Sequence, residues 1–151
     1  FSLFVAFNRL YSHFYLHSAR RGEGDKWQAT QGVLSAVGPH VLLAAVMADG
    51  GEHDLRVVID LTRPDGRFYL VANRRRDGGD ADQNRQLHRR LMSATPATRA
   101  GAILEYVYHI RCNMFHGAKD FDGEQIEVVT PAARILERVV LAGLEQVEHA
   151  V

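Results

Sequence analysis

Apolar residues recur at three- and four-residue steps along much of the chain, which is the period of an α-helix. The first such stretch covers residues 3–21 and is expected to end at Gly22. The second begins at Asp25, a suitable N-cap, and runs to about residue 49, with Pro39 kinking or splitting it. The N-terminal third of the chain is therefore predicted to be helical.

The pattern changes after the polar stretch "DGGEHD". The runs "LRVVIDL" (residues 55–61) and "RFYLVA" (residues 67–72) are rich in β-branched and aromatic residues, and the turn sequence "TRPDG" separates them. These runs predict a small β-hairpin, and a helix over residues 52–61 is the competing interpretation. The next segment, "NRRRDGGDAD" (residues 73–82), is charged and rich in glycine, and we expect a mobile surface loop there.

Further helices are expected in the C-terminal half. A short one covers about residues 83–93. The Thr-Pro pair at residues 95–96 supplies an N-cap and a first-turn proline to a long helix that runs to about Phe115 or His116. The same Thr-Pro signal at residues 130–131 is predicted to open the last helix.

The length and composition fit a single domain. With 151 residues, of which 46% are hydrophobic and 24% charged, the chain can build one core over residues 1–151. The predicted fold is all-α, an up-and-down bundle of four long helices and a short one. The hairpin and the arginine-rich loop would be inserted over about residues 52–82.

The charge and cysteine content narrow the function further. Eighteen basic residues balance eighteen acidic ones, so any binding to a polyanion must come from a local patch. Cys112 is the only cysteine, which excludes an internal disulfide and favours a reducing, cytoplasmic location. The opening "FSLFVAF" is too short to span a bilayer and leads into Asn8 and Arg9 without a cleavage signature, so we expect no signal peptide and no membrane partner.

The helix over residues 97–116 carries the most informative pattern. Its apolar residues form one narrow stripe that we expect to face the core: Ile103, Val107, Ile110 and Met114. A polar strip lies to the other side, where a monomer would leave it in water or give it to a partner: Glu105, His109, Cys112, Asn113 and His116. Arg111 flanks the apolar stripe, about 140° around an ideal helix from His116. The helix end or a second copy of the helix would have to bring these two residues together.

The segment "YHIRCNMFHGAK" (residues 108–119), with Gly117 ending the helix, resembles the motif of the HEPN superfamily. Members of this superfamily are helical bundles with an arginine, a nearby polar residue and a histidine near the end of a late helix. The resemblance covers the last two predicted helices and, more loosely, the first one ("FNRLYSHFY"). It implies a metal-independent endoribonuclease that acts as a homodimer, with the two motifs meeting across the interface. It assigns catalytic roles to Arg111 and His116, with Asn113 as the polar residue, and implies neither a metal nor a cofactor.

These residue types suit cleavage of RNA by attack of the ribose 2′-OH on the adjacent phosphate. A histidine can exchange the proton near neutral pH. An arginine can hold the phosphate oxygens and stabilise the charge of the transition state. In a symmetric dimer one His116 could act as base and the other as acid, while Asn113 orients a ring or a hydroxyl. The alternative is a structural role for both residues, in which His116 ends the helix and Arg111 pairs with a nearby carboxylate.

Other residues have weaker functional interpretations. A phosphate-binding patch could include Arg74, Arg75 and Arg76, together with Lys119 after the motif. Aspartates interrupt the arginine run, however, and charge runs are usually solvated faces. Later arginines could extend that patch: Arg85, Arg89 and Arg90. His13 and His17 lie on one face of the first helix, but no third ligand accompanies them to form a metal site.

Three functions therefore compete. The first is a cytoplasmic RNA endonuclease of the toxin or anti-phage defence type, with RNA as substrate and an antitoxin or regulator protein as a further partner. The second is a non-catalytic HEPN-like module that binds nucleotide, RNA or a partner protein. The third is a structural helical domain within a longer chain, which fits a sequence that begins at Phe1.

Overall fold

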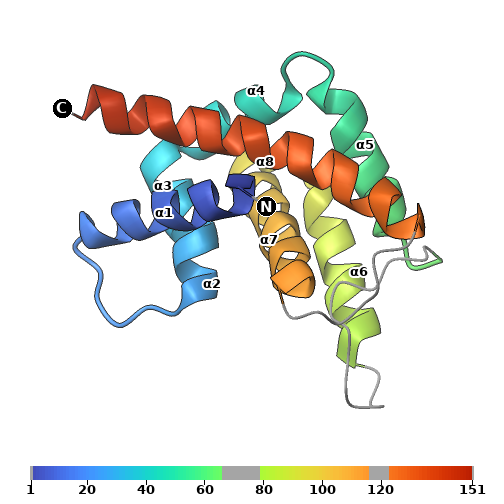
Figure 1. The fold of residues 1–151 in the computed structure, drawn as a ribbon. Helices are drawn as coiled ribbons and strands as arrows, with labels where there is room; N and C mark the ends of the chain where they lie inside the picture. The colour runs from blue at the N-terminus through green and yellow to red at the C-terminus, as the bar shows by residue number, and fades with distance from the viewer. Residues whose placement is uncertain (1, 66–78, 116–122, 151) are drawn as a thin grey trace.

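The computed structural model describes residues 2–65, 79–115 and 123–150. For residues 79–81, 113–115 and 123–125 it describes the backbone alone. The described part of the chain is helical and contains no strand, which confirms the all-α prediction. The elements, drawn in Figure 1, are α1 (Ser2–Leu16), α2 (Asp25–Trp27), the π-helix η1 (Gln28–Gly32), α3 (Val33–Val37), α4 (Pro39–Met47), α5 (Gly51–Leu61), α6 (Gly79–Leu91), α7 (Pro96–Phe115) and α8 (Gly123–His149).

The helix α7 lies at the centre of the fold. It contacts α6 along one side, and α4, η1, α3 and α8 surround the rest of it. In Figure 1, α6 and α7 run side by side, whereas α8 and its neighbour α1 run across them at a steep angle. The described helices are therefore not aligned as in an up-and-down bundle, and this part of the prediction is wrong.

The central position of α7 explains its burial pattern. Ile103, Val107 and Ile110, which form most of the predicted core stripe, are all buried. The neighbouring Leu104 and Tyr106 are also fully buried, so the apolar surface of α7 extends well beyond one stripe. A helix that is enclosed on several sides buries residues that an amphipathic surface helix would expose.

The first helix is shorter than predicted. α1 ends at Leu16, and the residues that follow satisfy carbonyl oxygens of its last turn. The imidazole Nδ1 of His17 lies 2.8 Å from the His13 carbonyl oxygen, and the Ser18 hydroxyl donates a hydrogen bond to the Tyr15 carbonyl oxygen at 2.8 Å.

The predicted second helix is broken into shorter pieces. α2 begins at Asp25, but Gly24 occupies the N-cap position, so Asp25 is the first helical residue and not the cap. After η1 and α3, Gly38 adopts a φ of +87°, a conformation that glycine reaches without strain. Pro39 then begins α4, and the helices before and after Gly38 are bent by 96°. The predicted split at Pro39 is thus confirmed.

The predicted β-hairpin is wrong at its first strand. Residues 55–61 lie in α5, as the competing helical interpretation expected. Leu55 and Val58 are buried one turn apart, and Glu52 and Asp54 in the first turn suit the positive end of a helix. Burial of this face, mainly against α8, outweighs the strand preference of the β-branched residues.

The rest of the predicted insertion has a mixed outcome. The second predicted strand, residues 67–72, lies outside the described residues. The end of the predicted loop is helical, because α6 begins at Gly79. The short helix predicted over about residues 83–93 corresponds to the later part of α6, which ends at Leu91.

The last helix begins before its predicted start. Thr130 and Pro131 lie inside α8, so the Thr-Pro signal does not open this helix, and that prediction is wrong. A proline inside a helix removes the N–H that would bond the carbonyl four residues earlier. Contacts with the core support this turn, because Val128 packs against the core and its carbonyl oxygen accepts a hydrogen bond from the buried Tyr106 hydroxyl at 3.5 Å.

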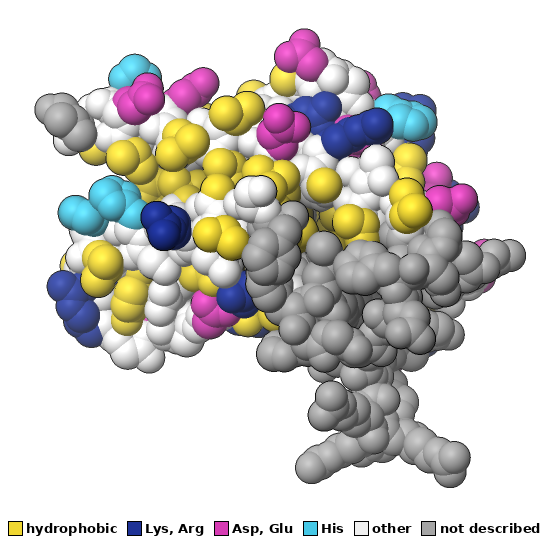
Figure 2. Space-filling view, in the orientation of Figure 1, with side chains coloured by type: hydrophobic (Ala, Val, Ile, Leu, Met, Phe, Trp, Pro, Cys, Tyr) yellow, Lys and Arg dark blue, Asp and Glu magenta, His cyan; other side chains and the backbone are white. Residues whose placement is uncertain are grey.

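The outer face of the molecule in Figure 2 combines α1 and α8. Apolar side chains are exposed there among charged and histidine side chains of both helices. The exposed residues of this kind include Arg9 and His13 of α1, and Arg134, Glu137, Glu145 and Glu148 of α8. Exposed apolar residues of these two helices include Val5, Leu16, Leu141 and Leu144, whose exposed fractions are 37%, 70%, 55% and 46%.

Candidate functional site

Arg111 lies near the C-terminal end of α7, and its side chain reaches the start of α2. Its Nη1 donates a hydrogen bond to Asp25 Oδ2 at 2.7 Å. Its guanidinium carbon also lies 5.7 Å from the centre of the Tyr108 ring, within the range of a cation–π interaction. Only 20% of the side chain is exposed. The positive charge is therefore held in a defined place beside the end of α7.

Asp25 uses both of its carboxylate oxygens. Oδ2 accepts the bond from Arg111, and Oδ1 accepts a hydrogen bond of 2.6 Å from the Tyr11 hydroxyl. Burial raises the pKa of Asp25, but the hydrogen bonds from Tyr11 and Arg111 outweigh it, and the pKa lies below its usual value. Burial, followed by the hydrogen bond to Asp25, raises the pKa of Tyr11, so the phenol stays protonated as a donor. The cluster joins α1, α2 and α7.

A second polar cluster surrounds Glu105, farther back along α7. Lys26 Nζ lies 2.8 Å from Glu105 Oε1, and Arg90 Nη1 lies 2.5 Å from Oε2. His109 Nε2 is 3.6 Å from Oε1, one turn along the same helix. Burial raises the pKa of Glu105, but the hydrogen bonds from His109, Arg90 and Lys26 hold that pKa far below its usual range. Glu105 is therefore a firmly ionised carboxylate that joins α2, α6 and α7.

These contacts correct one expectation for the polar strip of α7. The side chains of Glu105 and His109 are each only 17% exposed, because α2 and α6 of the same chain cover this part of the strip. Cys112, farther along the strip, is a half-buried free thiol, and its sulfur lies 4.0 Å from Arg111 Nη1. A second copy of the chain is not needed to cover the start of the strip.

Several predicted site residues lie where the structure says little. Asn113 belongs to the last turn of α7, but its side chain is not among those described. His116, Lys119 and the arginine run at residues 74–76 lie outside the described residues. The structure therefore brings Arg111 together with Asp25, and the predicted pairing of Arg111 with His116 stays a prediction.

The sequence did not reveal the partners of Arg111 and Glu105. The sequence marks Asp25 as a helix cap, and no pattern distinguishes Tyr11 from the other aromatic residues of the first helix. Lys26 belongs to no motif, and Arg90 is one of several arginines that could extend a phosphate-binding patch. The contacts Arg111–Asp25 and Glu105–Lys26 join residues 86 and 79 positions apart, a separation over which periodicity and spacing give no information.

The histidine pair of α1 does not form a metal centre with other described residues. The rings of His13 and His17 lie 4.2 Å apart, and His17 Nδ1 is directed at a carbonyl of its own helix. Among residues 2–65, 79–115 and 123–150, no group of three or more histidine, cysteine, aspartate or glutamate side chains is arranged to hold a metal ion.

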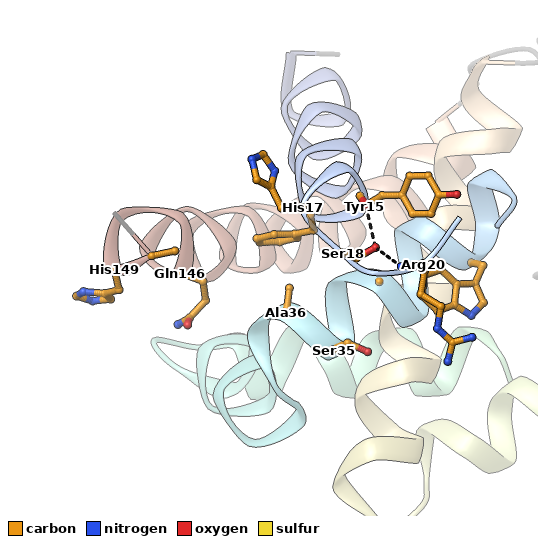
Figure 3. A pocket seen from close by; sticks show the side chains of 12 residues that line it. Tyr15, His17, Ser18, Arg20, Ser35, Ala36, Gln146 and His149 are labelled. Carbon is orange, nitrogen blue, oxygen red and sulfur yellow. Dashed lines mark hydrogen bonds between the residues drawn. The ribbon is translucent and has the colours of Figure 1, made fainter. Parts of the chain in front are cut away.

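A separate pocket of about 610 Å³ lies between the end of α1, α3 and the end of α8. Its lining includes the aromatic side chains of Phe14, Tyr15 and Trp27, and the Arg20 guanidinium carbon lies 5.4 Å from the Trp27 ring centre. Figure 3 shows Gln146 of α8 reaching toward α3, whereas the His17 ring points away from the cavity. Neither Arg111 nor Glu105 contributes to this pocket.

Comparisons with known proteins add no relative to this description. Neither a family model, nor a curated protein, nor a solved structure matches the chain significantly. Within the described parts of the chain, no single helix has both the length and the apolar composition needed to cross a membrane. The segments Asp25–Val37 and Pro39–Met47 meet that test only when taken together, across the 96° bend.

Proposed function

We propose that the chain is a metal-independent RNA endonuclease of the HEPN type, acting as a toxin or in anti-phage defence. The observation that carries the proposal is the fixed position of Arg111 at the end of α7, where Asp25 and Tyr108 hold its guanidinium. A charge held in place before substrate binds stabilises a transition state without the cost of reorganisation. In the sequence, His116 follows directly after the last residue of α7.

In this mechanism the protein acts on the ribose 2′-OH and the adjacent phosphate. Arg111 binds phosphate oxygens and stabilises the negative charge of the pentacovalent transition state. His116 accepts the 2′-OH proton, and the His116 of a second protomer donates a proton to the leaving 5′ oxygen. Asn113 orients one of these groups. The composite site requires a homodimer, and the products are a 2′,3′-cyclic phosphate and a free 5′-OH.

The test is cleavage of structured and single-stranded RNAs in excess EDTA. Wild-type protein is expected to leave 2′,3′-cyclic phosphate ends, and Arg111→Ala and His116→Ala are expected to lose this activity while remaining folded. The exposed residues Arg56 and His53 of α5 offer matched controls, and Arg56→Ala and His53→Ala should cleave like wild type. Cleavage that survives in both motif variants would exclude these residues as the active site.

The second candidate is a non-catalytic module that binds nucleotide, RNA or a partner protein. The observation in its favour is the ion pair between Arg111 and Asp25. The Asp25 carboxylate offsets the positive charge of Arg111 that would stabilise the transition state. This candidate predicts that wild-type protein binds RNA or nucleotide but releases no cyclic phosphate ends in the same assay.

A further inference from the structure

The cluster around Glu105 carries more positive than negative charge. Glu105 is a single carboxylate, and it is contacted by the ammonium group of Lys26 and the guanidinium group of Arg90 as well as by His109. Asp25 lies next to Lys26 in the sequence, but its carboxylate is bound to Tyr11 and Arg111. Among the described residues, Lys26 and Arg90 pair with no other carboxylate, so this part of the chain has one unit of positive charge in excess beside α7, although the chain as a whole is neutral.

The two cations keep donors for a further ligand. An ammonium group has three N–H donors and a guanidinium group has five, and each side chain donates one hydrogen bond to Glu105, from Lys26 Nζ and from Arg90 Nη1. The side chains of Lys26 and Arg90 are 52% and 39% exposed. Glu105 thus holds the Lys26 ammonium and the Arg90 guanidinium next to each other and leaves both partly exposed to solvent.

Lys26 and Arg90 lie beside α7, the helix that carries Arg111. Figure 1 shows α2 and α6 on either side of α7, and Lys26 and Arg90 reach Glu105 from these two helices. Glu105 precedes Arg111 by six residues, which is about 9 Å along the axis of an α-helix. Lys26 follows Asp25, the partner of Arg111, so the two polar clusters meet at the start of α2, within reach of one bound RNA strand.

We propose that Lys26 and Arg90, fixed by Glu105, form a binding surface for the phosphate groups of the RNA backbone. The choice of RNA as ligand rests on the proposed function. Backbone contacts of this kind position a nucleic acid without reading its sequence. The surface comes from three helices that are distant in the sequence, and it is distinct from the arginine run at residues 74–76.

Binding can be measured apart from cleavage with a fluorescent single-stranded RNA in which every 2′-OH is methylated, because the attacking hydroxyl is then blocked. In anisotropy titrations over a range of salt concentrations, Lys26→Gln/Arg90→Gln is expected to bind about tenfold more weakly than wild type. For two lost phosphate contacts, the slope of log K against log salt should fall by about 1.4. Arg56→Gln/Arg63→Gln, in α5 and just after it, removes the same charge from exposed sites and should bind like wild type.

A second pair of variants separates binding from folding. Lys26→Arg and Arg90→Lys keep the charge and should retain the affinity and the salt slope of wild type. An unchanged affinity and slope in Lys26→Gln/Arg90→Gln, or no binding by wild type at low salt, would overturn the proposal. Binding by wild type with no cleavage of ordinary RNA would instead remove the proposed function and leave this surface in place.

Discussion

Asp25 illustrates how a residue can be placed correctly in the sequence and still have another role in the fold. The sequence marks it as the start of a helix, and α2 does begin there. Its carboxylate, however, binds Tyr11 and Arg111 instead of the backbone N–H groups of its own helix. A local signal predicts the backbone, because caps act over a few residues. It does not predict the side-chain partner, which depends on how α1 and α7 pack.

The first prediction concerns this contact and uses Asp25→Asn. If Asp25 positions Arg111, cleavage should fall roughly tenfold, since small displacements of a catalytic group are costly. Because the Asp25 side chain is 48% exposed, the free energy of unfolding should fall by less than about 1 kcal/mol. Single-turnover cleavage and urea denaturation measure the two effects. Faster cleavage would show instead that Asp25 blocks Arg111, and Tyr11→Phe, which leaves the ion pair, serves as control.

The second prediction concerns the stability that Glu105 supplies. Glu105→Gln should lower the free energy of unfolding by about 2 kcal/mol at pH 7, the range for a largely buried carboxylate with charged hydrogen-bond donors. The pKa of Glu105 is lowered in the folded state, so its contribution is complete above the unfolded pKa of about 4.3 and is lost as the pH falls through the folded pKa. The difference between the two proteins should therefore be constant near neutrality and shrink below about pH 4. Urea denaturation at pH 7 and pH 3 tests this, and an equal difference at both pH values would contradict it.

At the scale of elements, periodicity predicted helices well where one face of the helix meets the core. The prediction failed where two local preferences competed, as in α5, whose β-branched residues suit a strand but whose buried Leu55 and Val58 follow the helical period. Ion pairs with α8 also stabilise the position of α5. The buried Asp54 of α5 binds Arg138 at 2.8 Å and Arg134 at 3.3 Å, and both arginines belong to α8. The paired residues lie 80 and 84 positions apart in the sequence, and no local pattern marks them.

Two glycine substitutions give a third prediction for individual helices. Gly101 lies within α7, and a Cβ there would meet its nearest neighbours at 3.7 Å or more, so Gly101→Ala should stabilise the protein by about 0.5–1 kcal/mol. A Cβ at Gly51 would lie 1.7 Å from the Val46 carbonyl oxygen, a backbone atom. Gly51→Ala should therefore destabilise the protein by more than about 3 kcal/mol. Thermal unfolding compares the two, and equal effects would contradict the packing around α5.

At the scale of the whole molecule, the all-α class followed from the sequence, but the arrangement of the helices did not. Hydrophobic periodicity shows which face of a helix is buried and contains no information on the angle at which two helices cross. The steep crossing of α8 over α7, visible in Figure 1, depends on which side chains meet. The break at Gly38 was easier to predict, because proline restricts the backbone by itself.

The last prediction belongs to the assembly, because a composite active site exists only in a dimer. Cleavage per protomer should be constant at high protein concentration and fall on dilution below the dissociation constant of the dimer. Exposed apolar side chains, such as those of α1 and α8 in Figure 2, are typical of surfaces that associate. Sedimentation velocity over the same concentrations should show the dimer dissociate where the specific activity falls. An enzyme that keeps its full specific activity as a monomer would contradict the composite site and place both catalytic steps within one chain.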